Sequence, residues 1–476
     1  AVASLGAAVA FIDATIVNIA FPDIARSFPG TSISALSWIL NAYNIVFAAF
    51  LVAAGRIADL VGRRRLFVLG MTVFIVASLA CALAQSPELL IACRAVQAMG
   101  AALLVPASLA LVLHAYPREQ RSHGVALLSA VAAVAAGLGP SLGGLLVAAA
   151  GWRMVFLVNV PIGLTAIVLA HRYLVESVTP GSRRMPDLAG ALLFALAIAA
   201  LVLGIVQGQG WGWASTPIIA ALALAVALGA IVIRRCRSHP AAVVDLGVLR
   251  IRAFSAANAI TIITAAGYYG YTLANVLFLT AVWHYSVLKA GLALTPGPFV
   301  AAAVAGPSSR LIGRVGYRPV LAVGGLLWSG AVIWLIARVG IAPAYLSRWL
   351  PATVLLGLGA GTLFPNVSGA AIVSAPGDGF ATASALNSVA RQVGASLGVA
   401  LVVAVIGTPS PVHALAAFDR AWTLAAAFLL VAGLGSLIVE IPPKRSPGLL
   451  ATPAPVHPRP WWAGVRRPRL LPLRRP

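Results

Sequence analysis

The chain has 476 residues, of which 61% are hydrophobic and only 9% are charged. A soluble domain is roughly 45–50% apolar and about 25% charged, so this composition excludes most soluble folds. The net charge of +22 would suggest nucleic-acid binding on a soluble protein, but the mean hydropathy of +0.98 favours a membrane protein instead. Cys81, Cys93 and Cys236 are too few and too scattered for a disulfide framework or a zinc site.

Long apolar runs follow one another along the chain as far as residue 440. A helix that crosses the hydrocarbon core of a bilayer needs about 20 mostly apolar residues. The runs predict an all-α polytopic membrane protein with fourteen transmembrane helices, at 2–22, 34–55, 65–84, 88–113, 122–149, 153–172, 188–207, 215–233, 254–282, 290–312, 319–338, 346–372, 379–406 and 418–440. We do not expect the first run to be a signal peptide, because it contains Asp13 and Asn18 and lacks a basic head.

The basic residues are distributed unevenly between the two sides of this fourteen-helix arrangement. Most of the 33 Lys and Arg residues fall in the loops of one side and in the C-terminal tail. The positive-inside rule assigns that side to the cytoplasm, so we expect a multi-pass protein with both termini cytoplasmic. Arginine supplies 31 of the 33, which is typical of a GC-rich bacterial genome and favours the bacterial cytoplasmic (inner) membrane. The net charge is then an orientation signal that needs no nucleic-acid partner.

The sequence repeats itself at nearly constant spacing. Residues 56–64 resemble 310–318, residues 100–106 resemble 359–365, and residues 141–143 resemble 396–398. The order is the same in both copies, which predicts two related six-helix bundles at 1–175 and 252–440, with two inserted helices at 186–235. Two parallel six-helix halves around a central site are a transporter architecture. The remaining segment, 441–476, is rich in Pro and Arg and is expected to be a disordered cytoplasmic tail.

Four motifs in the correct order resemble those of one family. Residues 13–22 resemble the first-helix signature of the 14-helix drug:proton antiporters, and residues 55–64 the loop signature of the major facilitator superfamily. Residues 90–100 resemble its helix-4 motif, and residues 135–144 the helix-5 motif of its antiporters. The resemblance covers 1–440 and implies the major facilitator fold and multidrug efflux. Arg56, Leu60 and Ala135 depart from the motifs, and Gly313 stands where the second copy of the loop would carry an acid.

Asp13 and Arg94 are the candidate proton-coupling residues. Asp13 is the acid inside the predicted hydrocarbon spans, where a central charge costs roughly 2.5–3.5 kcal/mol and normally faces a cavity or a partner. Arg94 shares a helix face with Gln97 three residues later, and it could switch Asp13 between protonation states. Two static alternatives stay open: a hydrogen bond from Asp13 to Asn18 or helix-end backbone, and a clamp of Arg94 on backbone carbonyls.

The loop signature and the helix-5 motif predict two structural devices. By resemblance, Gly55, Asp59, Gly62, Arg63 and Arg64 form a cytoplasmic gate that latches the two halves together; the alternative is a plain positive-inside charge.

In the helix-5 motif, Gly137, Gly139, Pro140, Gly143 and Gly144 allow a helix to bend and to approach a neighbour closely. Residues 139–143 also fit the G-x-S-x-G pattern of hydrolases. That pattern needs a strand-turn-helix and His and acidic partners, so a nucleophile is rejected.

Polar and aromatic residues within the apolar runs are candidate substrate ligands. Such groups amid apolar walls are typical of a pocket for amphiphilic small molecules, although interhelical hydrogen bonding explains them as well. The candidates are Asn18, Trp38, Asn41, Asn44, Gln97, Tyr268, Tyr271, Asn275, Asn387 and Arg391.

The sequence has neither a Walker A motif nor a metal-like spacing of His residues, so we expect no cofactor, no metal and no enzyme activity. The hypothesis is an exporter of amphiphilic drugs or antibiotics in exchange for protons, acting as a monomer among membrane lipids. A proton-coupled uptake symporter for a small metabolite is the alternative. The tenth helix carries no acid, which disfavours divalent organic cations and leaves anionic and neutral substrates open.

Overall fold

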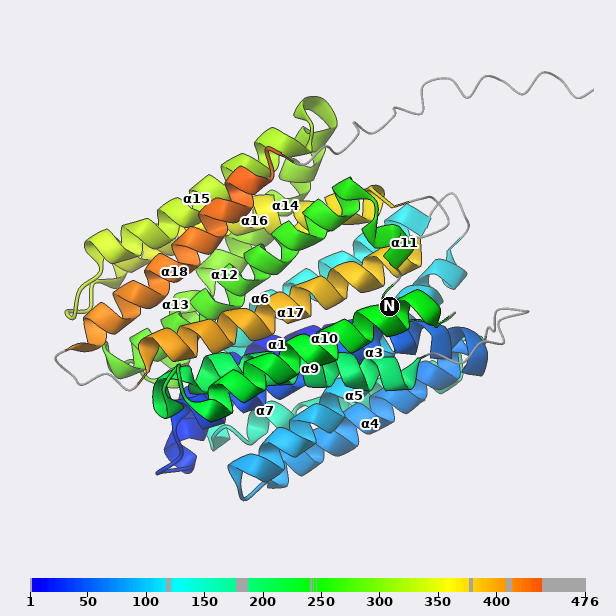
Figure 1. Ribbon diagram of the computed structural model, residues 1–476, viewed down its shortest axis with the longest axis horizontal. Coiled ribbons are helices and arrows are strands. Elements are labelled where there is room, and N and C mark those ends of the chain that lie inside the picture. Colours follow the sequence, from blue (N-terminus) through cyan, green and yellow to red (C-terminus); the bar gives the residue numbers. More distant parts are fainter. Residues whose placement is uncertain are drawn as a thin grey trace, which may run out of the picture. The chain divides into compact units, whose positions relative to one another are not determined.

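The computed structural model describes residues 2–116, 121–176, 187–239, 242, 244, 246–375, 380–407 and 413–438. Within these ranges every regular element is a helix (Figure 1). The chain divides into a unit of Ala1–Ile441 and a second unit of Pro442–Pro476. The predicted tail at 441–476 lies outside the described residues.

The helices of the N-terminal half are α1 (Val2–Ser27), α2 (Ile33–Leu36), α3 (Trp38–Val61), α4 (Arg63–Leu83), α5 (Pro87–Ala115), α6 (Arg121–Ala150), α7 (Met154–Leu157) and α8 (Asn159–Tyr173). The inserted segment forms α9 (Leu188–Trp211), α10 (Thr216–Ser238) and the short α11 (Leu246–Leu249). The C-terminal half contains α12 (Arg252–Ala281), α13 (Val287–Leu294), α14 (Pro296–Val315), α15 (Tyr317–Arg338), the π-helical turn η2 (Tyr345–Trp349), α16 (Leu350–Val373), α17 (Phe380–Ile406) and α18 (Ala414–Gly435).

The helices match the predicted spans. Among the described residues, 13 helical segments are long and apolar enough to cross a membrane, and Gly137–Ala150 of α6 is a shorter apolar segment within the remaining run. Several boundaries differ from the prediction: α3, for example, continues to Val61 where an end at 55 was predicted, and α10 to Ser238 where an end at 233 was predicted. Helix α1 continues through Pro22 to Ser27, and α18 spans Ala414–Gly435 where 418–440 was predicted.

A glycine turn recurs in the two halves. Gly62 separates α3 from α4 with φ 108° and ψ 142°, and Gly316 separates α14 from α15 with φ 85° and ψ 175°. A residue with a Cβ rarely adopts such positive φ angles. The equivalence of these two turns supports the predicted duplication.

Glycines also allow the repeated helix pairs to pack closely. A Cβ on Gly100 of α5 would lie 2.7 Å from the backbone nitrogen of Phe74 in α4. Its counterpart in the second half, Gly359 of α16, is as close to α15, where a Cβ would lie 2.5 Å from the Trp328 nitrogen. Small residues at such crossings bring helix backbones together and strengthen their packing. The helix-4 motif therefore fixes the same helix contact in both halves.

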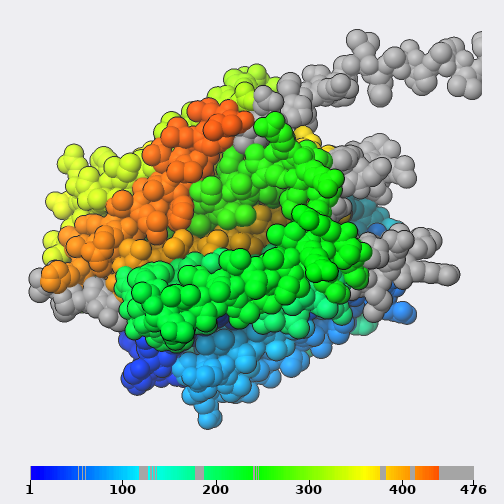
Figure 2. Space-filling view, viewed as in Figure 1, coloured from blue at the N-terminus to red at the C-terminus, as the bar shows by residue number. Residues whose placement is uncertain are grey.

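The inserted helices attach to both halves through α9. This helix packs against α3 of the N-terminal half and α17 of the C-terminal half, whereas α10 packs mainly on α9. Half of the apolar window of α9 is buried, compared with 17% of that of α10, so α10 is the more peripheral of the two. In the space-filling view the green inserted helices form much of the face toward the viewer (Figure 2).

An ion pair joins the ends of α9 and α10. Asp187 caps α9 by accepting a hydrogen bond from the Gly190 N–H at 2.8 Å, and both its oxygens lie 2.8 Å from Nε of Arg235 in α10. Burial of the carboxyl opposes ionisation, but the Gly190 N–H and Arg235 outweigh it and hold the pKa of Asp187 below its ordinary 3.8. The folded state therefore favours the ionised carboxylate.

Replacing Gly359 by Ala should destabilise the protein by about 1–3 kcal/mol, because the new methyl group meets the α15 backbone. Gly330→Ala in α15 is the matched control, because a Cβ there would meet nothing within 4 Å. It should be neutral or stabilise the helix by up to about 1 kcal/mol. Thermal unfolding of the purified variants measures both effects, and equal midpoints would contradict the packing argument.

Replacing Asp187 by Ala should cost about 1–2 kcal/mol at neutral pH, through loss of the helix cap and its ion pair. Because the folded-state pKa is depressed, the contribution of Asp187 is complete above about pH 4 and is lost as the pH falls through that pKa. The difference in unfolding midpoint between the two proteins should thus shrink on acidification below about pH 4. A difference that stays constant would contradict this account.

Candidate functional site

Asp13 lies at the centre of a buried polar network in the N-terminal half. Its side chain is 0% exposed, near the middle of α1. Oδ2 accepts a hydrogen bond from Nη1 of Arg94 at 2.5 Å, and Oδ1 accepts from Nε2 of Gln97 at 2.9 Å and Nδ2 of Asn159 at 3.1 Å. Three donors from α5 and α8 thus hold this carboxylate away from lipid and bulk water.

Arg94 is enclosed as completely as its partner. Its Nη1 also donates to Oε1 of Gln97 at 2.5 Å, as the predicted shared helix face requires, and its Nε donates to the Ile39 carbonyl at 3.4 Å. The guanidinium carbon lies 4.1 Å from the centre of the Tyr43 ring and 5.7 Å from that of Phe156. Cation–π contacts of this kind stabilise a desolvated charge.

Ser78 bridges two of the residues that bind Asp13. The hydroxyl of Ser78 in α4 accepts from Gln97 at 2.5 Å and from Asn159 at 3.2 Å. Residues from α1, α3, α4, α5 and α8 therefore meet around one ion pair. Removing one member of such a buried pair leaves an uncompensated charge and costs about 3–5 kcal/mol.

Ser78, Asn159 and Tyr43 were not among the site residues predicted from the sequence. Asn159 could have been predicted only from its position as a polar residue inside an apolar run. Of the static alternatives, the bond between Asp13 and Asn18 is not formed, because Asn18 donates to the Ala14 carbonyl of its own helix at 2.9 Å. The contact of Arg94 with a backbone carbonyl is present, but it is longer than the bond to Asp13.

The loop between α3 and α4 uses an acid from a distant part of the chain. Glu176, after α8, accepts hydrogen bonds from the backbone N–H groups of Arg64 and Arg65, both at 3.1 Å. A Cβ on Gly62 would lie 2.5 Å from Oε1 of Glu176, so this glycine allows the carboxylate to approach. A carboxylate at a helix N-terminus is stabilised by the free N–H groups and the helix dipole.

The predicted gate is therefore described only in part. The side chain of Asp59 lies outside the described residues, and Gly55 lies near Pro106 of α5, 3.9 Å from where a Cβ would stand. Helix α4 begins at Arg63, and Glu176 accepts hydrogen bonds at this N-terminus. This role of Glu176 was not predicted from the sequence. A lone Glu after an apolar run gave no signal of this contact.

The helix-5 motif lies between the two halves of the protein. On one side of α6, Gly139 and Gly143 pack against Thr15, Ile16 and Ile19 of α1. On the other side, Gly144 approaches Leu288 and Pro140 approaches Gly291, both in α13, while Gly137 faces Pro298 of α14. The motif thus makes the close helix contacts predicted for it, and it joins α1 to the C-terminal half.

Several predicted substrate ligands are buried within one half. Asn275 accepts from the Trp422 indole at 2.9 Å, and Asn387 donates to Asn258 and Thr261 at 3.2 and 3.0 Å. Tyr271, Asn41 and Asn44 are also buried. Trp38, Tyr268 and Arg391 are only partly buried. These three remain the better placed for a ligand in this conformation.

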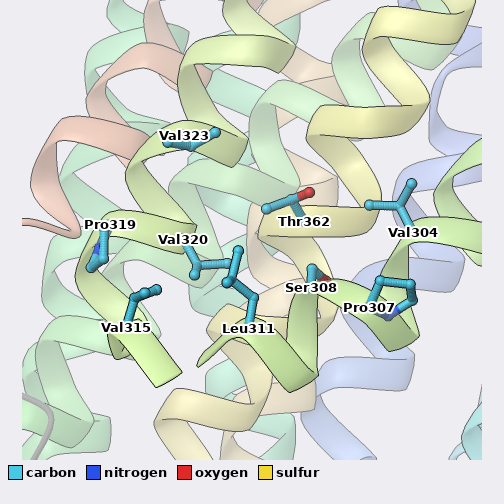
Figure 3. A pocket seen from close by; sticks show the side chains of 9 residues that line it. All are labelled: Val304, Pro307, Ser308, Leu311, Val315, Pro319, Val320, Val323 and Thr362. Atoms are coloured by element: carbon cyan, nitrogen blue, oxygen red, sulfur yellow. The ribbon is translucent and has the colours of Figure 1, made fainter. Parts of the chain in front are cut away.

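A surface pocket of about 340 Å³ lies between α14, α15 and α16 (Figure 3). Its walls are mostly Val, Leu and Pro side chains. The hydroxyls of Ser308 and Thr362, which also line it, are bonded to backbone carbonyls at 3.0 and 2.7 Å. None of the predicted site residues lines this pocket, and it offers no charged group for recognition.

Residues 3–249 match the family model of the Major Facilitator Superfamily. The chain belongs to this superfamily. It is 33% identical to the multidrug resistance protein Stp of Mycobacterium tuberculosis strain H37Rv, over 84% of this chain and 74% of that protein. It is 31% identical to the methylenomycin A resistance protein of Streptomyces coelicolor, over 85% and 84%, and 32% identical to the protein of that name in Bacillus subtilis, over 88% and 89%.

Solved structures of the superfamily share the fold. A POT family transporter in complex with 5-aminolevulinic acid superposes with a TM-score of 0.65 at 15% identity, over 90% of this chain and 94% of that one. The human organic anion transporter MFSD10 gives 0.61 at 14% identity, over 91% and 98%. The predicted all-α major facilitator fold is confirmed. The protein is a multi-pass membrane transporter with bacterial relatives, in a family that is not enzymatic.

Replacing Glu176 by Gln should lower stability by about 1 kcal/mol, because the amide keeps the shape but loses the charge at the α4 N-terminus. Salt should reduce the difference, since screening weakens exposed electrostatic contacts. Glu88→Gln is the control for the general effect of removing an acid near a helix N-terminus, because Glu88 is exposed in the first turn of α5. Unfolding midpoints at low and high salt test this, and equal effects of the two substitutions would contradict a specific role for Glu176.

Proposed function

We propose that this transporter exports amphiphilic drugs or antibiotics in exchange for protons, by alternating access of a central site. The observation that carries the proposal is the buried pair of Asp13 and Arg94, a titratable group and its counter-charge within a transport fold. The bacterial relatives named above are resistance proteins, which supports export over uptake. The helix-5 motif between α1 and the C-terminal half supports the same assignment.

Proton binding to Asp13 would change the balance of charge in the network. With Asp13 ionised, the pair is neutral and every oxygen of the carboxylate has a donor. With Asp13 protonated, Arg94 carries an uncompensated charge among apolar side chains, which is costly in a low-dielectric interior. The neutral and protonated networks therefore favour different arrangements of α1, α5 and α8.

This local change has a direct route to the interface between the halves. Helix α1 contacts α12 and α13 of the C-terminal half, and α6 joins α1 to α13. A displacement of α1 thus alters the surfaces on which the two bundles meet. Transport then follows when the proton-bound and proton-free states expose the substrate to opposite sides of the membrane.

The surroundings of the transporter complete the proposal. Lys and Arg residues concentrate on the loops of one side, which supports a bacterial cytoplasmic membrane with both termini inside. We take the monomer as the working unit, because one chain supplies both bundles and the inserted helices that span them.

A resistance panel in an efflux-deficient bacterial host, with and without an uncoupler, should find compounds that the protein excludes from cells. Resistance should disappear when the uncoupler dissipates the proton gradient. Resistance that persists would contradict proton antiport. If expression protects against none of the compounds and raises the uptake of a metabolite, the alternative of an uptake symporter is favoured.

In everted membrane vesicles, Asp13→Asn should reduce proton-driven transport of a compound from that panel to the level of vesicles without the protein, because the amide cannot carry a proton. Asp419→Asn is the matched control, since Asp419 is an acid inside α18 and outside the network. Undiminished transport by the Asp13 variant would remove Asp13 from the coupling mechanism. Equal amounts of folded protein are checked by gel filtration.

A further inference from the structure

Arg391 is a second charged residue in the middle of a transmembrane helix. It lies eleven residues from the start of α17, a helix of 27 residues. Its side chain is not fully buried, and the guanidinium carbon lies 5.5 Å from the centre of the Phe11 ring in α1. The side chain therefore points from the C-terminal half toward the N-terminal half, and away from lipid.

The surroundings of Arg391 differ from those of Arg94 in one decisive respect. Arg94 is neutralised by Asp13. Within the described part of the chain, Arg391 forms neither an ion pair nor a hydrogen bond. Asn387, one turn earlier on α17, donates its amide hydrogens to Asn258 and Thr261 of α12 and not to a partner shared with Arg391.

An unpaired guanidinium at this depth requires a partner. A central charge in a membrane helix is expensive, and such residues pair with each other or line a water-filled path for substrates and ions. Arginine offers five N–H donors in a planar fork that matches a carboxylate, sulfonate or phosphate. The missing counter-charge is thus one that a bound anion can supply.

The walls near Arg391 suit the rest of an amphiphilic molecule. Phe11 lies on one side, and Tyr269 lies within electrostatic range of the guanidinium. Tyr269 packs edge-on against Tyr268 with ring centres 5.1 Å apart, and Tyr268 packs against Phe364 of α16 at 5.5 Å. All four rings keep part of their exposure. A cation beside Phe11 and Tyr269, with further aromatic rings packed in sequence beyond Tyr269, favours a ligand with an apolar body and a negative group.

We propose that Arg391 binds the anionic group of the transported compound, so that the substrates are amphiphilic organic anions. The inference rests on the proposed export function for the direction of transport, but binding itself does not require a proton gradient. It also links the two charged sites. Phe11 and Asp13 are two residues apart on α1, which directs one toward Arg391 and the other toward Arg94 on nearly opposite faces.

Equilibrium binding to the purified full-length protein tests the proposal, with three probes that share a naphthalene ring: 1-naphthylacetate, the neutral 1-naphthylacetamide and the cationic 1-naphthylmethylammonium. The anion should bind most tightly. Arg391→Gln should weaken binding of 1-naphthylacetate by about 10- to 100-fold and leave the neutral amide unchanged, because only the charged group loses a charge-assisted hydrogen bond. Arg391→Lys should be intermediate, since it keeps the charge without the fork.

Arg420→Gln, at an exposed arginine of α18, is the control and should bind all three probes as the parent protein does. Failure of the anion to bind, tighter binding of the neutral or cationic probe, or an unchanged Arg391→Gln variant would overturn the proposal. Uncoupler-sensitive efflux of neutral antibiotics would then still support the proposed function. Conversely, Arg391-dependent anion binding without proton-driven transport would uphold the anion site and overturn the antiporter.

Discussion

The ion pair between Asp13 and Arg94 is the constraint around which the N-terminal half is built. Neither charge can reach water or lipid, so each must find its partners among neighbouring helices, and five of them contribute. Buried charges are tolerated when the pair is close and its remaining hydrogen-bonding capacity is used. That condition fixes the relative depth and rotation of α1, α3, α4, α5 and α8. In the mechanism that we propose, protonation of the Asp13 carboxyl would therefore change the packing of all five helices.

Helix α1 presents functional side chains on two opposite faces, and each face contacts a different part of the site. One face carries Asp13 into the closed network, and the other presents Phe11 to Arg391 of α17. Along the same helix, Ile16 and Ile19 receive the glycines of α6, which in turn reach α13. A single rigid helix therefore touches the ionisable pair, the unpaired arginine and the interface between the halves. This geometry supports the coupling of proton and substrate that we propose.

Most of the fold could be predicted from sequence, because the length and hydropathy of a membrane span are local properties of the chain. The ends of helices were harder: α1 passes through Pro22, and α18 starts before Phe418. Asp13, Arg94 and Gln97 were found because charges are rare in spans and because i, i+3 neighbours share a face. Ser78, Asn159 and Glu176 were missed, because their partners lie on helices that are distant in the sequence and meet only in the folded protein. Small polar residues and a lone loop acid carry no local mark of such partners.

The position of α9 has a consequence for motion. It touches α3 and α17 at once. In the alternating-access cycle that we propose, α9 could not move with both bundles, and one of the two contacts would have to slide. The residues of α9 that are buried in the core shared with both halves are aliphatic: Ala195, Ile198, Val202 and Val206. Hydrophobic contacts are non-directional, so these side chains can shift against their neighbours without breaking a hydrogen bond. The inserted pair can thus seal the seam between the bundles against lipid while leaving them free to move.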